Sequence, residues 1–194
     1  MVNNVVLSPY ELLYIAVCLG ATEVFGIEDA YYGMNETEIK TIIINLQTAL
    51  EERKYATIYF DGRFEIADNV RTAMETVAKC EKLVVVNDVD IYYSKNEKII
   101  NLQKSGKAYA LLEIPNLTDA VLSSWSGESS FCVSVTKFDD KYSITQSVAF
   151  EFVNELVQVY TEKGVTPEFE YIEREKQEPI SFEQAKNIVR EVLA

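Results

Sequence analysis

The stretch LVVVNDVDIYYSKNEKIINLQKSGKAYALLEI, residues 83–114, decides the fold class of this 194-residue chain. Its apolar, β-branched and aromatic residues fall into four short runs, at residues 83–86, 89–93, 99–104 and 109–114. Between the runs stand turn-forming residues, among them Asn87-Asp88 and Ser105-Gly106. Short apolar runs separated by such residues are typical of successive β-strands. The alternation of strands and helices with Gly-rich turns that marks a nucleotide-binding fold is missing.

Helices are predicted on both sides of this stretch. At three places a capping residue is followed three positions later by Glu or Gln, which is the pattern of a helix start: Ser8 with Glu11, Asn35 with Glu38, and Ser181 with Gln184. In the second of these helices the apolar residues Ile39, Ile42, Ile43, Leu46 and Leu50 repeat at helical spacing, and we expect the helix to reach about residue 53.

The remaining segments extend the pattern. Asp61-Gly62 predicts a hairpin between strands 55–60 and 63–66, because both turn positions favour positive φ. Asp68 is then expected to cap a helix that carries Val70, Ala73, Met74 and Val77. Two further strands are expected at 131–138 and 142–146, and a helix at 148–163, where apolar residues repeat at helical spacing. The charged residues 166–179 are expected to form an exposed strand or a loop.

Together these elements predict an α+β fold, with a mostly antiparallel (mixed) sheet flanked by helices at both ends. The length suits one domain over residues 1–194. The segment 166–194, a charged stretch followed by the last helix, belongs to that domain or forms an appendage to it.

The charge balance limits the classes of partner. Eighteen Lys and Arg against 31 Asp and Glu give a formal net charge of −13. Proteins that bind phosphate backbones or anionic lipids need a cationic face, so neither nucleic acid nor a membrane surface is an expected partner. No apolar run approaches the roughly 18 residues that span a bilayer. The first residues lack the pattern of a secretory signal, and we expect a cytoplasmic protein.

Few residues are suited to catalysis. The chain has no histidine, which excludes Ser-His and Cys-His pairs, and it has no phosphate-binding glycine motif. The aspartates that could suggest a carboxylate site all stand at expected turns or helix starts: Asp61, Asp68, Asp88, Asp90, Asp139 and Asp140. We therefore predict no catalytic, cofactor-binding or metal-binding residues and no enzymatic activity.

The aromatic residues are the candidates for contact with a partner. The chain has 12 tyrosines, nine phenylalanines and one tryptophan. Tyr92, Tyr93 and Trp125 stand in or near expected loops, and Tyr and Trp are enriched in recognition surfaces. One of Tyr92 and Tyr93 is expected to face the core, because successive residues of a strand point to opposite sides.

The order of elements resembles a known family. The segments LSPYELLYIAVCLG, ATIYFDGRFEIADNV and LVVVNDVDIYY, followed by the strands YALLEI and FCVSVTKF, resemble the EspG-like, ESX secretion-associated chaperones of type VII secretion, in particular those of Gram-positive bacteria outside the mycobacteria. The resemblance covers roughly residues 7–163. It implies a cytosolic, non-enzymatic protein that binds one secreted substrate and keeps it soluble for export.

Two alternatives to a secretion chaperone stay open. A small acidic α+β protein also suits an immunity protein that neutralises a basic toxin. An enzyme built on two carboxylates is a more distant alternative. A DNA-binding winged helix, to which residues 35–80 are locally similar, is set aside because the expected recognition helix is acidic.

Overall fold

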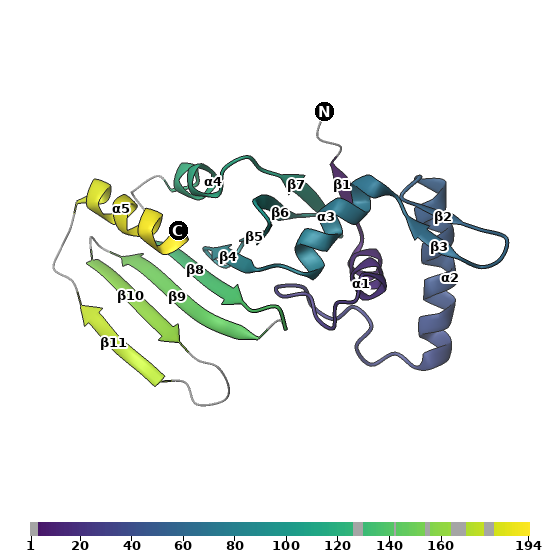
Figure 1. Ribbon diagram of the computed structural model, residues 1–194, viewed down its shortest axis with the longest axis horizontal. Coiled ribbons are helices and arrows are strands. Elements are labelled where there is room, and N and C mark those ends of the chain that lie inside the picture. The colour runs from purple at the N-terminus through teal and green to yellow at the C-terminus, as the bar shows by residue number, and fades with distance from the viewer. Residues whose placement is uncertain (1–3, 126–129, 142, 154–155, 164–169, 177–180) are drawn as a thin grey trace. The chain divides into compact units, whose positions relative to one another are not determined.

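The structure is a computed structural model that describes residues 4–125, 130–141, 143–153, 156–163, 170–176 and 181–194 (Figure 1). It has an α+β fold with a large antiparallel sheet, as predicted. The chain gathers into two compact units. Unit 1 comprises Met1–Lys79 and Leu102–Glu113, and unit 2 comprises Cys80–Asn101 and Ile114–Ala194. The single domain expected over residues 1–194 stays a prediction.

Over its described residues, unit 1 contains three helices and several antiparallel strands. The helices are α1 (Pro9–Cys18), α2 (Glu36–Glu52) and α3 (Asp68–Ala78). Strand β1 (Val5–Leu7) pairs with β7 (Ala108–Glu113), and β2 (Ala56–Ile58) pairs with β3 (Phe64–Ile66).

Of the three side chains expected to cap helices in unit 1, Ser8, Asn35 and Asp68, the first two do so. Ser8 and Glu11 form a reciprocal capping box at α1, and Asn35 and Glu38 form another at α2. Asp68 does not cap α3, because it is already the first helical residue and Ala67 occupies the cap position. At the hairpin turn Gly62 has a positive φ of 84°, whereas Asp61 accepts a hydrogen bond from the backbone N–H of Arg63.

Over its described residues, unit 2 is an antiparallel sheet with two helices. Its strands run in the order β5-β4-β8-β9-β10-β11. Their bounds are β4 (Lys82–Val86), β5 (Asp90–Lys95), β8 (Phe131–Phe138), β9 (Ile144–Val153), β10 (Leu156–Lys163) and β11 (Glu170–Lys176). The helices are α4 (Leu117–Ser123) and α5 (Phe182–Leu193). Strand β6 (Lys98–Ser105) is divided between the units after Asn101.

The prediction of a helix over residues 148–163 is wrong. The described residues of this range, 148–153 and 156–163, belong to β9 and β10, which pair from Leu156↔Val153 to Lys163↔Gln146. The decisive pattern has a period of two: Val148, Phe150 and Phe152 alternate with Ala149 and Glu151, and Phe150 and Phe152 are buried while Glu151 is exposed. Aromatic and β-branched side chains favour such half-buried strands. The segment 166–179, expected as a strand or a loop, contains β11 over its described part.

The core of unit 2 lies between one face of its sheet and the helices α4 and α5. Val84, Val133 and Phe150 of the sheet are fully buried against residues such as Val121 of α4 and Val189 of α5. Burial of apolar area contributes about 25 cal/mol per Å², so this one-sided cluster is the main stabilising feature of the unit. Within the described ranges, no helix combines the length and apolar character needed to cross a bilayer.

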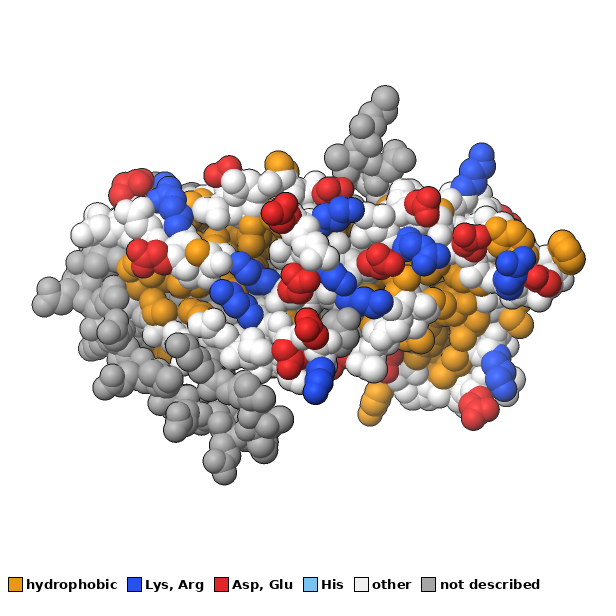
Figure 2. Space-filling view, in the orientation of Figure 1, with side chains coloured by type: hydrophobic (Ala, Val, Ile, Leu, Met, Phe, Trp, Pro, Cys, Tyr) orange, Lys and Arg blue, Asp and Glu red, His pale blue; other side chains and the backbone are white. Residues whose placement is uncertain are grey.

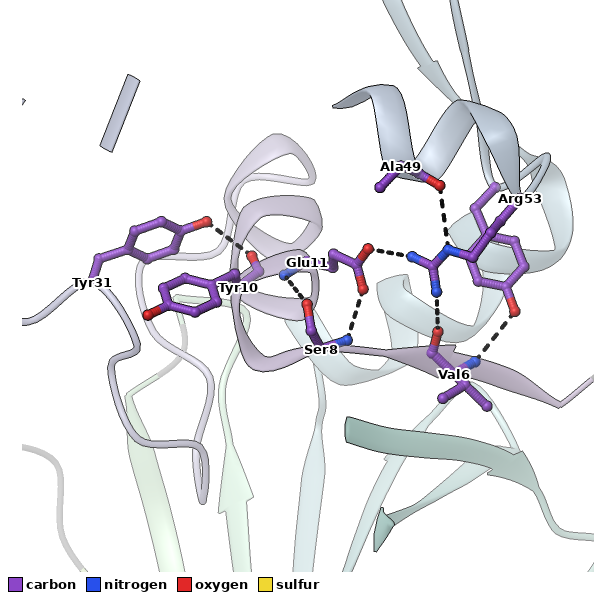
Figure 3. A network of polar contacts seen from close by, with 8 residues as sticks. Val6, Ser8, Tyr10, Glu11, Tyr31, Ala49 and Arg53 are labelled. Atoms are coloured by element: carbon purple, nitrogen blue, oxygen red, sulfur yellow. Dashed lines mark hydrogen bonds and ion pairs between the residues drawn. The ribbon is translucent and has the colours of Figure 1, made fainter. Parts of the chain in front are cut away.

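A buried ion pair joins the secondary structures of unit 1 (Figure 3). The Glu11 carboxylate is buried at the start of α1 and pairs with the Arg53 guanidinium at the end of α2. Arg53 also donates to the carbonyl of Val6 in β1 at 3.0 Å, and Glu11 accepts from the Ser8 backbone N–H at 2.7 Å. The guanidinium lies 4.8 Å from the centre of the Tyr55 ring. One pair of charges thus fixes α1, α2 and β1 together.

Removal of the Arg53 charge should destabilise unit 1, because it leaves the Glu11 carboxylate buried without a cation. We expect Arg53→Met to lower the free energy of unfolding by about 2–3 kcal/mol, the lower part of the range for buried pairs, since Arg53 is partly exposed. Lys40→Met is the control, because Lys40 pairs with Glu36 on the surface, and its effect should stay within about 0.5 kcal/mol. Urea unfolding followed by far-ultraviolet circular dichroism measures the free energy of unfolding of both variants. Equal midpoints for the two would contradict a stabilising role of the Glu11–Arg53 pair.

Candidate functional site

The three aromatic residues expected to contact a partner lie in the core. Tyr92, Tyr93 and Trp125 are 6%, 0% and 4% exposed. The Trp125 ring stacks on Phe131 with their centres 4.4 Å apart, and it meets the edges of three further rings, those of Phe150, Phe152 and Phe182. These side chains pack inside the protein and offer little area to a partner, so a contact surface has to be sought elsewhere.

An open apolar groove lies in unit 1 between α1, α2 and the loop that joins them. It encloses about 630 Å³, within the range of ligand and peptide sites. Its walls come from all three segments and are mostly aliphatic or aromatic: Leu13, Tyr14, Val17, Thr22, Glu23, Val24, Ile27, Asp29, Tyr31, Ile39 and Ile43.

The apolar stripe of α2 is only partly covered. Of the residues of α2, which is described over its whole length, only Leu50 is buried. Ile39 and Ile43 line the groove and are half-buried, and Val17 of α1, which lines it too, is 65% exposed. Figure 2 shows hydrophobic side chains gathered on the face over α2. Contiguous exposed apolar surface of this kind marks interaction sites on folded proteins.

Two tyrosines hold the walls of the groove. The Tyr31 hydroxyl donates to the backbone carbonyl of Tyr10 at 2.9 Å, which ties the loop to α1 (Figure 3). The Tyr10 and Tyr31 rings also meet edge to face, with their centres 5.3 Å apart. On the other side, the Tyr14 hydroxyl accepts a 2.6 Å hydrogen bond from the Gln47 amide of α2. The walls are therefore fixed by hydrogen bonds from their polar edges, while their apolar parts stay accessible.

The loop is shaped by glycines at its two ends. Gly20 and Gly33 have positive φ values of 89° and 78°, a conformation that costs other residues free energy. Between them Val24 is buried, and the Tyr31 backbone N–H donates to the Asp29 carboxylate at 2.9 Å. The loop thus has a defined path along the groove, with its acidic residues Glu23, Glu28 and Asp29 exposed.

The groove carries binding groups and no evident catalytic pair. Its two carboxylates, Glu23 and Asp29, are exposed, and no cluster of three His, Cys, Asp or Glu suited to a metal occurs among the residues that the structure describes. Away from the groove, Asp139 accepts from the backbone N–H groups of Lys141 and Ser143, and Asn87 and Asp88 adopt the positive φ of a tight turn. These aspartates are occupied in turn formation.

Comparison with known proteins does not assign the chain to a family. No protein-family model matches the chain, and no curated protein matches it.

The sequence contained a signal for exposed apolar surface on α2. Ile42, Ile43 and Ile44 are consecutive, and three neighbouring residues of a helix cannot all face one core. At least one isoleucine of this run had to lie near the surface, which is the case for Ile44. The loop between Gly20 and Met34 has too irregular a pattern to be placed against the helix from sequence.

Burial raises the pKa of the Tyr31 hydroxyl to about 12, with smaller contributions from Tyr10, Tyr14, Asp29 and Cys18. The raised pKa means that Tyr31 supports the fold fully below its ordinary pKa of 10.0 and loses that support as the pH rises from 10.0 to about 12. We expect the free energy of unfolding to fall across this range, and to fall less in Tyr31→Phe. Denaturant unfolding at several alkaline pH values measures the free energy of unfolding of the wild type and of Tyr31→Phe. An equal fall in the two proteins would contradict the assignment of this pH dependence to Tyr31.

Proposed function

We propose that this protein is a non-enzymatic chaperone or adaptor that binds another protein through the groove between α1 and α2. The specific form of the proposal is a cytoplasmic chaperone that binds one substrate of type VII secretion and keeps it soluble until export. The observation that carries the proposal is the partly uncovered apolar stripe of α2, which lines an open groove in an otherwise strongly acidic protein.

Physical chemistry supports a macromolecular partner. Exposed isoleucine and valine side chains cost free energy in water, and they become favourable when another apolar surface covers them. Surfaces of this type on folded proteins recognise amphipathic segments of partner proteins. A chaperone that covers the apolar face of an export substrate needs such a surface.

The secretion pathway in the proposal rests on the layout of the sequence. The capped first helix, the second helix with its hairpin, and the strands that follow resemble the EspG-like chaperones in their order. The elements present in the structure keep this order, with α1, α2, the β2-β3 hairpin, α3 and then β4 and β5.

An immunity protein is the second candidate. The acidic residues around the groove, Glu23, Glu28 and Asp29, would complement the basic surface of a nuclease toxin. The two functions differ in outcome. An immunity protein abolishes a toxic activity at stoichiometric amounts, whereas a chaperone keeps its partner soluble and leaves the partner's activity intact.

Groove variants test the proposal in the native cells. We expect Ile39→Glu and Ile43→Glu to lose the secreted protein that copurifies with the wild type, because a buried carboxylate would oppose the apolar contact. The affinity of each variant for the recovered partner should fall at least about tenfold, as is usual at the centre of an interface. Affinity purification and calorimetry provide the two readouts.

Ile44→Glu is the matched control, because Ile44 is the next residue of the same helix and does not line the groove. It should retain the partner. All three variants should melt within a few degrees of the wild type, which separates a lost contact from a lost fold. Recovery of the same partner by all three variants would refute binding at the groove. Absence of a secreted protein from repeated wild-type purifications would refute the chaperone function.

A further inference from the structure

The loop wall of the groove and the segment that follows it are strongly acidic, and two of their carboxylates, on Glu23 and Asp29, line the groove. Residues 20–40 form the loop and the first turn of α2, and they contain five carboxylates, on Glu23, Glu28, Asp29, Glu36 and Glu38, and one ammonium, on Lys40. Their net charge is therefore −4. The Lys40 ammonium lies 3.6 Å from the Glu36 carboxylate, so the one cation of this segment is already partly neutralised. An apolar floor with an acidic border defines the chemistry of what can cover it.

The two helical walls of the groove offer side chains and little backbone, and part of the loop wall is bonded internally, as between the Ile27 N–H and the Val24 carbonyl. The two long walls are helices, whose N–H and C=O groups are paired along the helix, as between the Leu12 N–H and the Ser8 carbonyl and between the Ile39 N–H and the Asn35 carbonyl. An extended peptide needs an open strand edge to satisfy its own backbone. A helical segment satisfies its backbone internally and needs only an apolar surface, so a helix suits this groove better than a strand.

We infer that the groove binds an amphipathic helix of the partner protein, with an apolar stripe facing α1 and α2 and Lys or Arg residues on both flanks of that stripe. The inference rests on the proposed function, because it names the chemistry of the partner at the same site. Apolar side chains at positions i, i+4 and i+7 of the partner helix cover Ile39, Ile43 and Val17. The flanking cations face the carboxylates of the loop and of the first turn of α2.

Charge disfavours the other occupants of the groove. A second copy of this chain would bring two acidic borders together, and like charges at an interface oppose association. An anionic membrane would be repelled in the same way. Opposite charge on a partner helix speeds encounter and selects the partner, while the apolar contact contributes most of the affinity.

Two synthetic helical peptides provide the test. They share one apolar stripe and differ only at the flanking positions, which are Lys in one peptide and Glu in the other. In fluorescence anisotropy with the full chain, we expect the Lys peptide to bind at least about tenfold more tightly at low salt, and the preference to shrink as NaCl is raised. Circular dichroism should show that the Lys peptide gains helix on binding.

Charge variants of the protein test which carboxylates cause the preference for the Lys peptide. Glu23→Lys with Glu28→Lys should weaken binding of the Lys peptide about tenfold, because it removes two attractions and adds two repulsions on the loop. Glu52→Lys is the matched control: Glu52 is exposed at the other end of α2, and its variant should bind the Lys peptide as the wild type does. Asp29 is left unchanged, because it holds the loop through the Tyr31 N–H.

Several outcomes would overturn the inference. They are equal affinities for the two peptides, no binding of either, binding without gain of helix, and equal effects of the double variant and Glu52→Lys. These outcomes are separate from a failure of the proposed function. If the native partner binds through Ile43 and the peptides show no charge preference, the groove is a protein site and the inference alone is wrong. If the Lys peptide binds as expected and no secreted partner exists, the chaperone function alone is wrong.

Discussion

The pairing of Glu11 with Arg53 is the interaction on which unit 1 depends. The Glu11 carboxylate is buried, and its pairing with Arg53 places the start of α1 beside the end of α2. Further along the same two helices, Tyr14 and Gln47 are joined by a hydrogen bond, and beyond them Val17, Ile39 and Ile43 line the groove. The polar contacts at one end therefore set the spacing of the apolar walls at the other.

This arrangement explains how apolar side chains can be presented without collapse. A loose helix would turn its isoleucines into the nearest core, whereas α2 is held by its final residues and by the hairpin that follows it. Leu50 is buried at the fixed end, while Ile39 and Ile43, nearer the free end, are only half-buried. Under the proposed function, Glu23 and Asp29 on the groove disfavour a second copy of this acidic chain and favour a cationic partner.

Much of the fold could be predicted from local sequence. The capping pairs at Ser8, Asn35 and Ser181 and the strands of residues 83–114 depend on neighbours only a few residues away, and the structure confirms them. Residues 148–163 were misassigned because Phe152, Leu156 and Val157 fit a helical spacing by chance, while the alternation of Val148, Phe150 and Phe152 gave the true period. The burial of Tyr92, Tyr93 and Trp125, and the exposure of the α2 stripe, depend on contacts between distant segments, which composition and spacing do not encode.

The most direct test of the account is photo-crosslinking in the native cells. A benzophenone amino acid would replace Ile43 in the groove or, as a control, Val89 in the turn between β4 and β5 of unit 2, which is 73% exposed. The account predicts a single crosslinked secreted protein from position 43 and no such product from position 89. Crosslinking of that protein from position 89 and not from position 43 would contradict the central claim that the groove between α1 and α2 is the partner site.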